Sequence, residues 1–138
     1  MRFFLDTNII VYALDGSDHA KSPKAKALVR EALVEQAGVI SYQVVQECLH
    51  LILRKFRRKI HDVDAHSYLA KVLMPLCNVY PSEGLYAEAI LIASQTGWTF
   101  YDSLIVSAAV ASDCELLITE DLQHGRTIRG VTIQNPFV

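Results

Sequence analysis

The chain has 138 residues, of which 51% are hydrophobic, so it is long enough to bury one core and is expected to form a single domain over 1–138. Its 13 basic and 15 acidic residues leave a net charge of −2, which by itself gives no indication of a nucleic-acid-binding protein. Three widely spaced cysteines without a C-x-x-C pair argue against a disulfide framework and a zinc site, and favour a reduced, cytoplasmic setting. We expect neither a signal peptide nor a membrane helix, because no apolar stretch is long enough.

Short apolar runs of β character alternate with longer helical patterns along the chain. The expected strands are residues 3–5, 39–40, 77–80, 116–119 and 131–133. The expected helices begin at Ser or Asp, which are common helix caps, and run over 22 to about 36, 41 to about 59, 62 or 64 to about 74, 82 to about 95, and 102 to about 111. This alternation predicts an α/β fold, with a doubly wound, parallel, five-stranded sheet flanked by helices.

Acidic residues stand where two predicted strands end and where one helix begins. Asp6 interrupts the apolar stretch FFLDTNIIVYAL directly after the first strand, and Asp121 follows the strand ELLIT. Asp102 starts a helix after the segment WTFYD. Taken singly, each acid can be a helix cap or a loop residue. Ligands of such sheets bind beyond the carboxyl ends of the strands, so the three acids are also expected to converge on one rim.

A fourth acid, Glu47, lies inside the predicted helix 41–59. At about 100° per residue, Glu47 falls on the border of an apolar face formed by Val44, Val45, Cys48, Leu49, Ile52 and Phe56. A glutamate on such a border is usually solvated, but this one can approach the same rim as the other acids. Four carboxylates at one site repel one another, an arrangement best explained by a divalent cation. Oxygen ligands favour Mg²⁺ or Mn²⁺ over zinc.

Four sequence blocks, in order, resemble PIN-domain proteins, particularly the VapC-type toxins of bacterial toxin–antitoxin pairs. The blocks are LDTNII, the QE pair in the middle of the chain, YDSLIVSAA, and ITEDLQHG followed by NPF. The resemblance spans nearly the full chain. It implies a PIN-like fold and a metal-dependent endoribonuclease that hydrolyses RNA phosphodiester bonds and leaves a 5′-phosphate.

The resemblance also implies the roles of individual residues. It implies four catalytic, metal-binding acids, which are Asp6, Glu47, Asp102 and Asp121. It assigns supporting polar roles to Asn8 and Thr119. Asp6 and Asp102 are expected to hold the principal Mg²⁺, for which Mn²⁺ can substitute, while the other two acids complete that site or hold a second ion. Glu120 adjoins Asp121, and the T-x-D spacing of the family favours Asp121.

The partners implied by the resemblance are an RNA substrate, a small antitoxin whose tail covers the site, and a second copy of the chain in a homodimer. A basic segment, LRKFRRKI, has five basic residues within positions 54–59. Such segments are often ordinary solvated helix ends. Here His50, Arg54 and Arg58 recur every four residues beside Glu47, so Arg54, Arg57 and Arg58 are candidate RNA-binding residues. Without the four acids the chain has 13 basic and 11 acidic residues, a balance of +2.

Three other classes of protein share some of these features. A haloacid-dehalogenase-type phosphatase has a second Asp two positions after the first, where this chain has Asn8. A response-regulator receiver needs an acidic pair before the first strand's Asp and a Lys near the end of the last strand, and neither is evident. The third alternative is a catalytically inactive PIN-like module that binds RNA or acts as a scaffold. The presence of all four acids argues against it, and a metal-binding titration distinguishes the two.

Overall fold

The centre of the molecule is a six-stranded sheet with the strand order β3-β2-β1-β4-β6-β5. The computed structural model describes residues 1–55 and 62–138. The strands are β1 (Phe3–Leu5), β2 (Gly38–Ser41), β3 (Cys77–Val79), β4 (Leu116–Ile118), β5 (Thr127–Ile128) and β6 (Val131–Gln134). All neighbouring strands pair in parallel except β5 and β6, which are antiparallel. The predicted α/β fold with a parallel sheet is therefore confirmed.

The expected number of five strands is wrong because of β5. This strand has only two residues, which is too short to show an apolar alternation in the sequence. It forms a hairpin with β6 through Arg129 and Gly130, whose φ angles are 48° and 82°. Two consecutive residues with positive φ are typical of the tight turns that join antiparallel strands.

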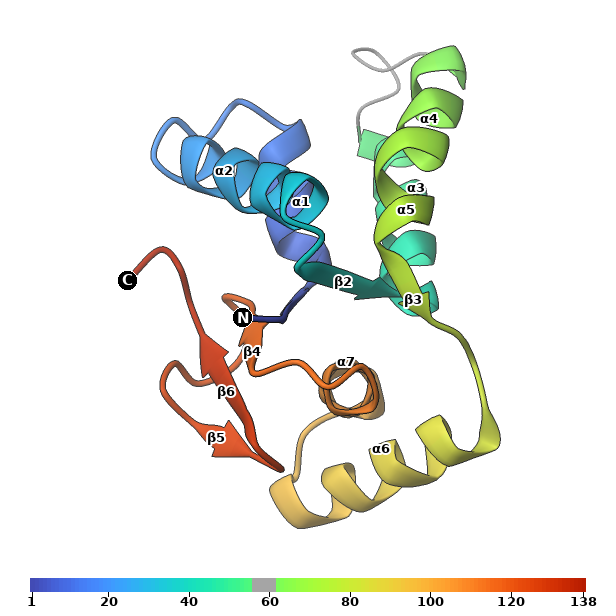
Figure 1. The fold of residues 1–138 in the computed structure, drawn as a ribbon, viewed down its shortest axis with the longest axis vertical. Coiled ribbons are helices and arrows are strands. Elements are labelled where there is room, and N and C mark those ends of the chain that lie inside the picture. The colour runs from blue at the N-terminus through green and yellow to red at the C-terminus, as the bar shows by residue number, and fades with distance from the viewer. Residues whose placement is uncertain (56–61) are drawn as a thin grey trace.

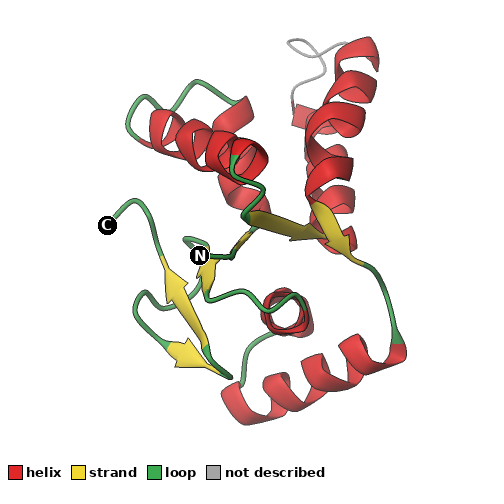
Figure 2. Ribbon diagram, viewed as in Figure 1, coloured by secondary structure: helices red, strands yellow, loops and turns green. Residues whose placement is uncertain are grey.

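Helices cover both faces of the sheet, as a doubly wound fold requires. They are α1 (Thr7–Leu14), α2 (Lys21–Val34), α3 (Tyr42–Lys55), α4 (Asp62–Tyr68), the π-helical segment η1 (Leu69–Leu73), α5 (Met74–Leu76), α6 (Glu83–Thr96) and α7 (Phe100–Ala111). Helices α1 and α2 lie on one side of the sheet, and α6 and α7 lie on the other (Figure 1). Figure 2 shows the alternation of helices and strands that the sequence predicted. None of the described helices has the length and apolar character needed to cross a bilayer.

Two predicted helix starts are correct to the residue. The Ser82 hydroxyl accepts a hydrogen bond from the Leu85 N–H at 3.1 Å, and the Ser41 hydroxyl accepts one from the Val44 N–H at 3.4 Å. Each serine caps a helix that begins at the next residue. Serine in an extended conformation satisfies a backbone donor that the first turn of a helix leaves unpaired.

Two other predicted starts are wrong. Helix α2 begins at Lys21, whose N–H donates to the Asp18 carboxylate at 2.9 Å, so Ser22 is not its cap. Helix α7 begins at Phe100, and the Thr99 hydroxyl accepts from the Asp102 N–H at 3.1 Å. Asp102 therefore does not cap this helix. Asp102 lies in the first turn, because the helix begins two residues before it.

The helix expected to run from residue 62 or 64 to about 74 is present, but α4, η1 and α5 divide it into an α–π–α succession that ends at Leu76. Helix α3 is described as far as Lys55, and the rest of the predicted helix 41–59 lies outside the described residues.

The sheet places two polar residues next to each other where β1 and β4 end. All three residues of β1 are buried, and full burial of a large apolar side chain contributes about 1.5–3 kcal/mol. The Asp6 N–H donates to the Ile118 carbonyl at 3.1 Å, and the Thr119 N–H donates to the Gln134 carbonyl at 3.0 Å. The strand pairing therefore continues one residue beyond β1 and β4. Asp6 and Thr119 are fixed at the carboxyl edge of the sheet by this buried pairing.

Candidate active site

A cleft of about 710 Å³ opens at this edge, between α1, α3 and the first turn of α7. Its lining includes all four acids that the sequence suggested, Asp6, Glu47, Asp102 and Asp121. They come from the end of β1, the middle of α3, the start of α7 and the loop after β4. The fold thus brings four segments that are distant in sequence to one cleft, and the catalytic role of the acids stays a prediction.

The residues that line the walls of the cleft are spaced three or four positions apart along two helices. Helix α1 contributes Asn8, Val11 and Tyr12, its C-cap contributes Asp15, and helix α3 contributes Gln43, Gln46, Glu47, His50 and Leu51. Residues three or four positions apart lie on the same face of a helix. Sequence analysis did not identify most of these lining residues as part of the site. The polar residues spaced three and four positions apart around Asn8 and Glu47 could have indicated them.

Asp6 is buried at the base of the cleft, with 7% of its surface exposed. Its Oδ1 accepts from the Thr7 N–H at 2.7 Å, and its Oδ2 accepts from the Thr119 hydroxyl at 2.8 Å. Burial raises the pKa of Asp6 to about 6, against the lowering effect of these two hydrogen bonds. The negative charges of Asp121 and Glu47 make smaller contributions to this rise. Asp6 therefore caps α1 and also belongs to an electrostatically coupled group of acids.

Asn8 connects the two strand ends. Its side-chain amide Nδ2 donates to Asp121 Oδ2 at 2.9 Å and to the Thr119 hydroxyl oxygen at 3.2 Å. The Asp121 N–H also donates to that hydroxyl oxygen, at 3.0 Å. The side-chain oxygen of Asn8 is buried and has no hydrogen-bond partner in the described part of the chain. Asn8 and Thr119 thus orient Asp6 and Asp121 through hydrogen bonds, and their supporting roles stay a prediction.

Glu47 and Asp102 approach the cleft from the two helices opposite Asp6. Glu47 Oε1 accepts from the Thr7 hydroxyl at 2.8 Å, a contact that nothing in the sequence indicated. Asp102 lines the cleft from the first turn of α7, and its carboxylate accepts no hydrogen bond from any residue in 1–55 or 62–138. This carboxylate is therefore available to a ligand.

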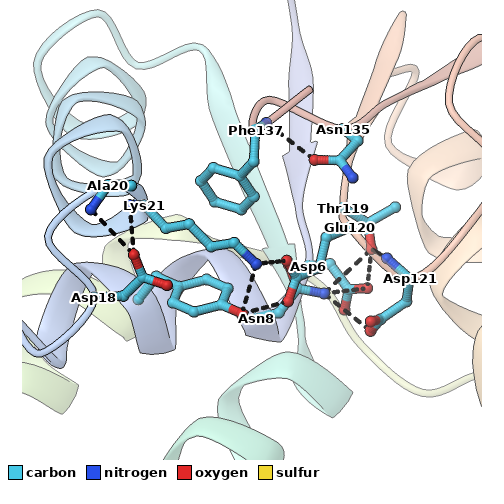
Figure 3. Close-up of polar contacts among 11 residues, drawn as sticks. Asp6, Asn8, Asp18, Ala20, Lys21, Thr119, Glu120, Asp121, Asn135 and Phe137 are labelled. Atoms are coloured by element: carbon cyan, nitrogen blue, oxygen red, sulfur yellow. Dashed lines mark hydrogen bonds and ion pairs between the residues drawn. The ribbon is translucent and has the colours of Figure 1, made fainter.

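Glu120 is directed out of the cleft, although it adjoins Asp121. Its two carboxylate oxygens accept from the Tyr12 hydroxyl at 2.5 Å and from Lys21 Nζ at 2.8 Å. Figure 3 shows Lys21 reaching Glu120, while Asp121 lies on the side of Asn8. Of the two neighbouring acids, Asp121 is therefore the one that lines the cleft.

Acidic side chains outnumber basic ones in the lining of the cleft, where His50 is the basic residue among those described. Of the described residues that line it, none is lysine or arginine. The ion pairs within the described residues, Lys21 with Glu120 and Arg129 with Glu88, involve none of the four acids. Carboxylate, amide and hydroxyl oxygens are the donors that hard divalent cations prefer, so the chemistry of the lining fits Mg²⁺ or Mn²⁺.

The side chains are not arranged as a complete metal site. Within residues 1–55 and 62–138, no three Asp, Glu, His or Cys side chains are placed to hold one ion between them. The carboxylates of Asp6, Glu47 and Asp121 instead accept hydrogen bonds from Thr7, Thr119 and Asn8. Binding one cation through three acids therefore requires some of these side chains to rotate.

His50, Arg54 and Arg58, spaced four residues apart, form the proposed basic stripe. Only the beginning of this stripe falls within the described residues. His50 lies on the cleft wall, and Arg54, four residues later on α3, is exposed. Arg57 and Arg58 lie outside the described residues. The structure thus places one candidate RNA-binding residue one helical turn from the cleft.

Comparisons with known proteins identify the family. The family model of the PIN domain matches residues 3–129. Comparison with curated protein sequences gives no match.

Solved structures with the same fold include a toxin–antitoxin complex from Klebsiella pneumoniae, 19% identical with a TM-score of 0.68 over 99% of this chain and 98% of that chain. FitAcB from Neisseria gonorrhoeae is 19% identical, with a TM-score of 0.66 over 98% of each chain. VapC20 from Mycobacterium tuberculosis, described as a toxin that cleaves the sarcin–ricin loop, is 18% identical, with a TM-score of 0.59 over 83% of this chain and 86% of that chain. The match of the family model over most of the sequence, together with this fold, shows that the chain belongs to the PIN domain family.

Proposed function

We propose that this protein is a Mg²⁺- or Mn²⁺-dependent endoribonuclease and the VapC-type toxin of a toxin–antitoxin pair. The observation that carries the proposal is the cleft lined by Asp6, Glu47, Asp102 and Asp121 at the carboxyl edge of the sheet. PIN domains are generally nucleases, and an acidic cleft with no lysine or arginine among its described lining residues suits a nuclease that depends on a divalent cation.

A divalent cation bound in this cleft would supply an activated nucleophile at neutral pH and compensate for the charge that develops on the phosphoryl oxygens. Asp6 and Asp102 would hold the principal ion, and Glu47 and Asp121 would complete the set of oxygen ligands. Asn8 and Thr119 hold Asp6 and Asp121 in place through the hydrogen bonds described above. The burial that raises the pKa of Asp6 also favours a nearby cation, because a cation stabilises the charged carboxylate.

RNA is the proposed substrate, and the VapC20 toxin that cleaves the sarcin–ricin loop is a structural neighbour that supports this choice. The proposed protein partner is a small antitoxin, supported by the toxin–antitoxin complex from Klebsiella pneumoniae. A homodimer and a cytoplasmic location complete the proposal. Arg54, together with Arg57 and Arg58, is assigned to attract RNA phosphates toward the cleft.

The experiment is an RNA cleavage assay on total bacterial RNA with mapping of new 5′ ends. We expect discrete new ends with Mg²⁺ or Mn²⁺ and none with EDTA. Asp6→Asn and Asp102→Asn should each abolish cleavage while circular dichroism stays unchanged. Asp113→Asn is the matched control, since Asp113 is exposed beyond the far end of α7 and its φ of 57° suits asparagine.

Two results would contradict the proposal. Near-normal cleavage by folded Asp6→Asn or Asp102→Asn would show that the assigned acids are not the ligands. RNA binding by the wild type without any cleavage, and without any response to metal, would favour the inactive RNA-binding or scaffold module.

A further inference from the structure

The residues that surround Glu120 come from three separate parts of the chain. Tyr12 lies in α1, Lys21 is the first residue of α2, and Phe137 lies near the C-terminus. Lys21 Nζ lies 4.9 Å from the centre of the Tyr12 ring and 5.3 Å from that of Phe137, and the two rings meet edge to face at 5.3 Å. Figure 3 shows the Lys21 side chain passing below Phe137 to reach Glu120. The Lys21–Glu120 ion pair is therefore contacted by both aromatic side chains, Tyr12 and Phe137.

Stability alone does not explain this ion pair. The side chains of Lys21 and Glu120 are 34% and 21% exposed, and partly exposed ion pairs contribute little to the free energy of unfolding. The two carboxylate oxygens of Glu120 accept hydrogen bonds from the Tyr12 hydroxyl and from Lys21 Nζ, so this carboxylate is held on the side away from the cleft.

The three consecutive residues 119–121 point to three different partners. The Thr119 hydroxyl donates to Asp6, the Glu120 carboxylate is bound by Lys21 and Tyr12, and the Asp121 carboxylate accepts from Asn8. Because Glu120 and Asp121 are consecutive, the bonds that hold the Glu120 carboxylate also restrict the backbone from which the Asp121 side chain extends. A released Glu120 is a longer carboxylate next to the cleft and can compete with Asp121.

We propose that Lys21 is a positioning residue, which acts with Tyr12 to hold Glu120 outside the cleft and thereby fixes Asp121 against Asn8 inside it. Lys21 acts through Glu120 and is not itself among the residues that line the cleft. Its effect on metal binding rests on the proposed function, whereas its effect on the Asn8–Asp121 hydrogen bond does not.

Substitution of Lys21 separates positioning from simple electrostatics, because the two predict opposite signs. Lys21→Met removes a positive charge near the acids, so Coulomb attraction alone predicts tighter binding of a cation. The positioning role predicts weaker binding, by about tenfold, since loss of a group that orients a metal ligand commonly costs at least this much affinity. Lys24→Met is the matched control, because Lys24 is exposed on the same helix and does not line the cleft.

Two measurements on the purified full chain test the proposal. Calorimetric titration with Mn²⁺ should give about tenfold weaker binding for Lys21→Met and no loss for Lys24→Met. In an Asp121→Asn background, adding Lys21→Met should cause no further loss, because Lys21 acts through Asp121. In metal-free protein, the side-chain amide resonances of Asn8 in a ¹⁵N NMR spectrum should shift in Lys21→Met and stay in place in Lys24→Met.

An Mn²⁺ affinity of Lys21→Met equal to or tighter than that of the wild type would overturn the proposal, and so would unmoved Asn8 resonances. If the wild type binds no Mn²⁺, the proposed function fails and the Asn8 resonances alone decide the positioning role. Should Lys21→Met fail to fold, Tyr12→Phe replaces it, since it removes the 2.5 Å hydrogen bond to Glu120 and retains the ring that contacts Phe137. The same shifts are then expected.

Discussion

The Thr119 hydroxyl donates a 2.8 Å hydrogen bond to Oδ2 of Asp6, a residue 113 positions away in the sequence. Both residues are buried, and both directly follow strands that pair in parallel in the centre of the sheet. The same hydroxyl oxygen accepts from the Asn8 side chain and from the Asp121 N–H. Thr119 is therefore the residue through which Asp6, Asn8 and Asp121 are joined.

Replacing Thr119 by the isosteric valine should destabilise the protein and change the titration of Asp6. Three hydrogen bonds lose their partner at a fully buried position, so we expect the free energy of unfolding to fall by about 1–3 kcal/mol. The pKa of Asp6 should rise further, because the bond from Thr119 lowers it. Urea denaturation and a carboxyl NMR titration measure the two effects. Thr119→Ser retains the hydroxyl, so an equal pKa change in that variant would contradict this explanation.

Asp6 should also make stability depend on pH when no metal is present. Its pKa rises from an ordinary value of 3.8 to about 6 on folding, so between these values the folded state binds more protons than the unfolded state. The contribution of Asp6 to the free energy of unfolding therefore decreases as pH rises from about 4 to 6, by at most about 3 kcal/mol, and stays low above pH 6. In EDTA, the stability of Asp6→Asn relative to wild type should increase over the same range. A difference that is constant from pH 4 to 7 would rule out a raised pKa.

The basic stripe predicts a specific salt dependence of RNA binding. Each phosphate contact releases counterions, so loss of a contact weakens affinity and reduces the slope of log affinity against log salt by about one unit. Arg54→Ala should show both changes without altering Mn²⁺ binding. Arg30→Ala is the matched control, because Arg30 is exposed on α2 and does not line the cleft. Equal slopes of log affinity against log salt for wild type and Arg54→Ala would contradict the RNA-binding role and indicate that segment 54–59 is an ordinary solvated helix end.

The sequence was informative where local patterns determine structure. The five longer strands, the alternation with helices and the positions of Asp6 and Asp121 after strands follow from apolar runs and from polar residues at their ends. Helical periodicity placed Glu47 on the border of an apolar face, a position with an ordinary solvated explanation, and the family resemblance then implied its catalytic, metal-binding role. Asp102 was placed near the correct end of its helix, but its role as the cap was wrong, because the helix begins two residues earlier and Thr99 is its cap.

Contacts between distant segments were not predictable in the same way. The Thr7–Glu47 and Lys21–Glu120 bonds join residues that are 40 and 99 positions apart, and no periodic pattern encodes them. The two-residue strand β5 is too short to have a pattern of its own. Such features depend on how the elements pack, which a single sequence read element by element does not contain.

The central claim is that Asp6, Glu47, Asp102 and Asp121 share one site for a divalent cation, and thermal unfolding with and without Mn²⁺ tests it most directly. A ligand that binds only the native state adds about 2.7 kcal/mol at a hundredfold excess over its dissociation constant. Mn²⁺ should therefore raise the unfolding midpoint of the wild type and of the Asp113→Asn control, and barely move that of Asp6→Asn. In EDTA near neutral pH, Asp6→Asn should unfold at or above the wild-type midpoint, because neutralising Asp6 relieves repulsion among the acids. A clearly lower midpoint of Asp6→Asn in EDTA, together with no Mn²⁺ shift in the wild type, would contradict the claim and leave Asp6 as the cap of α1.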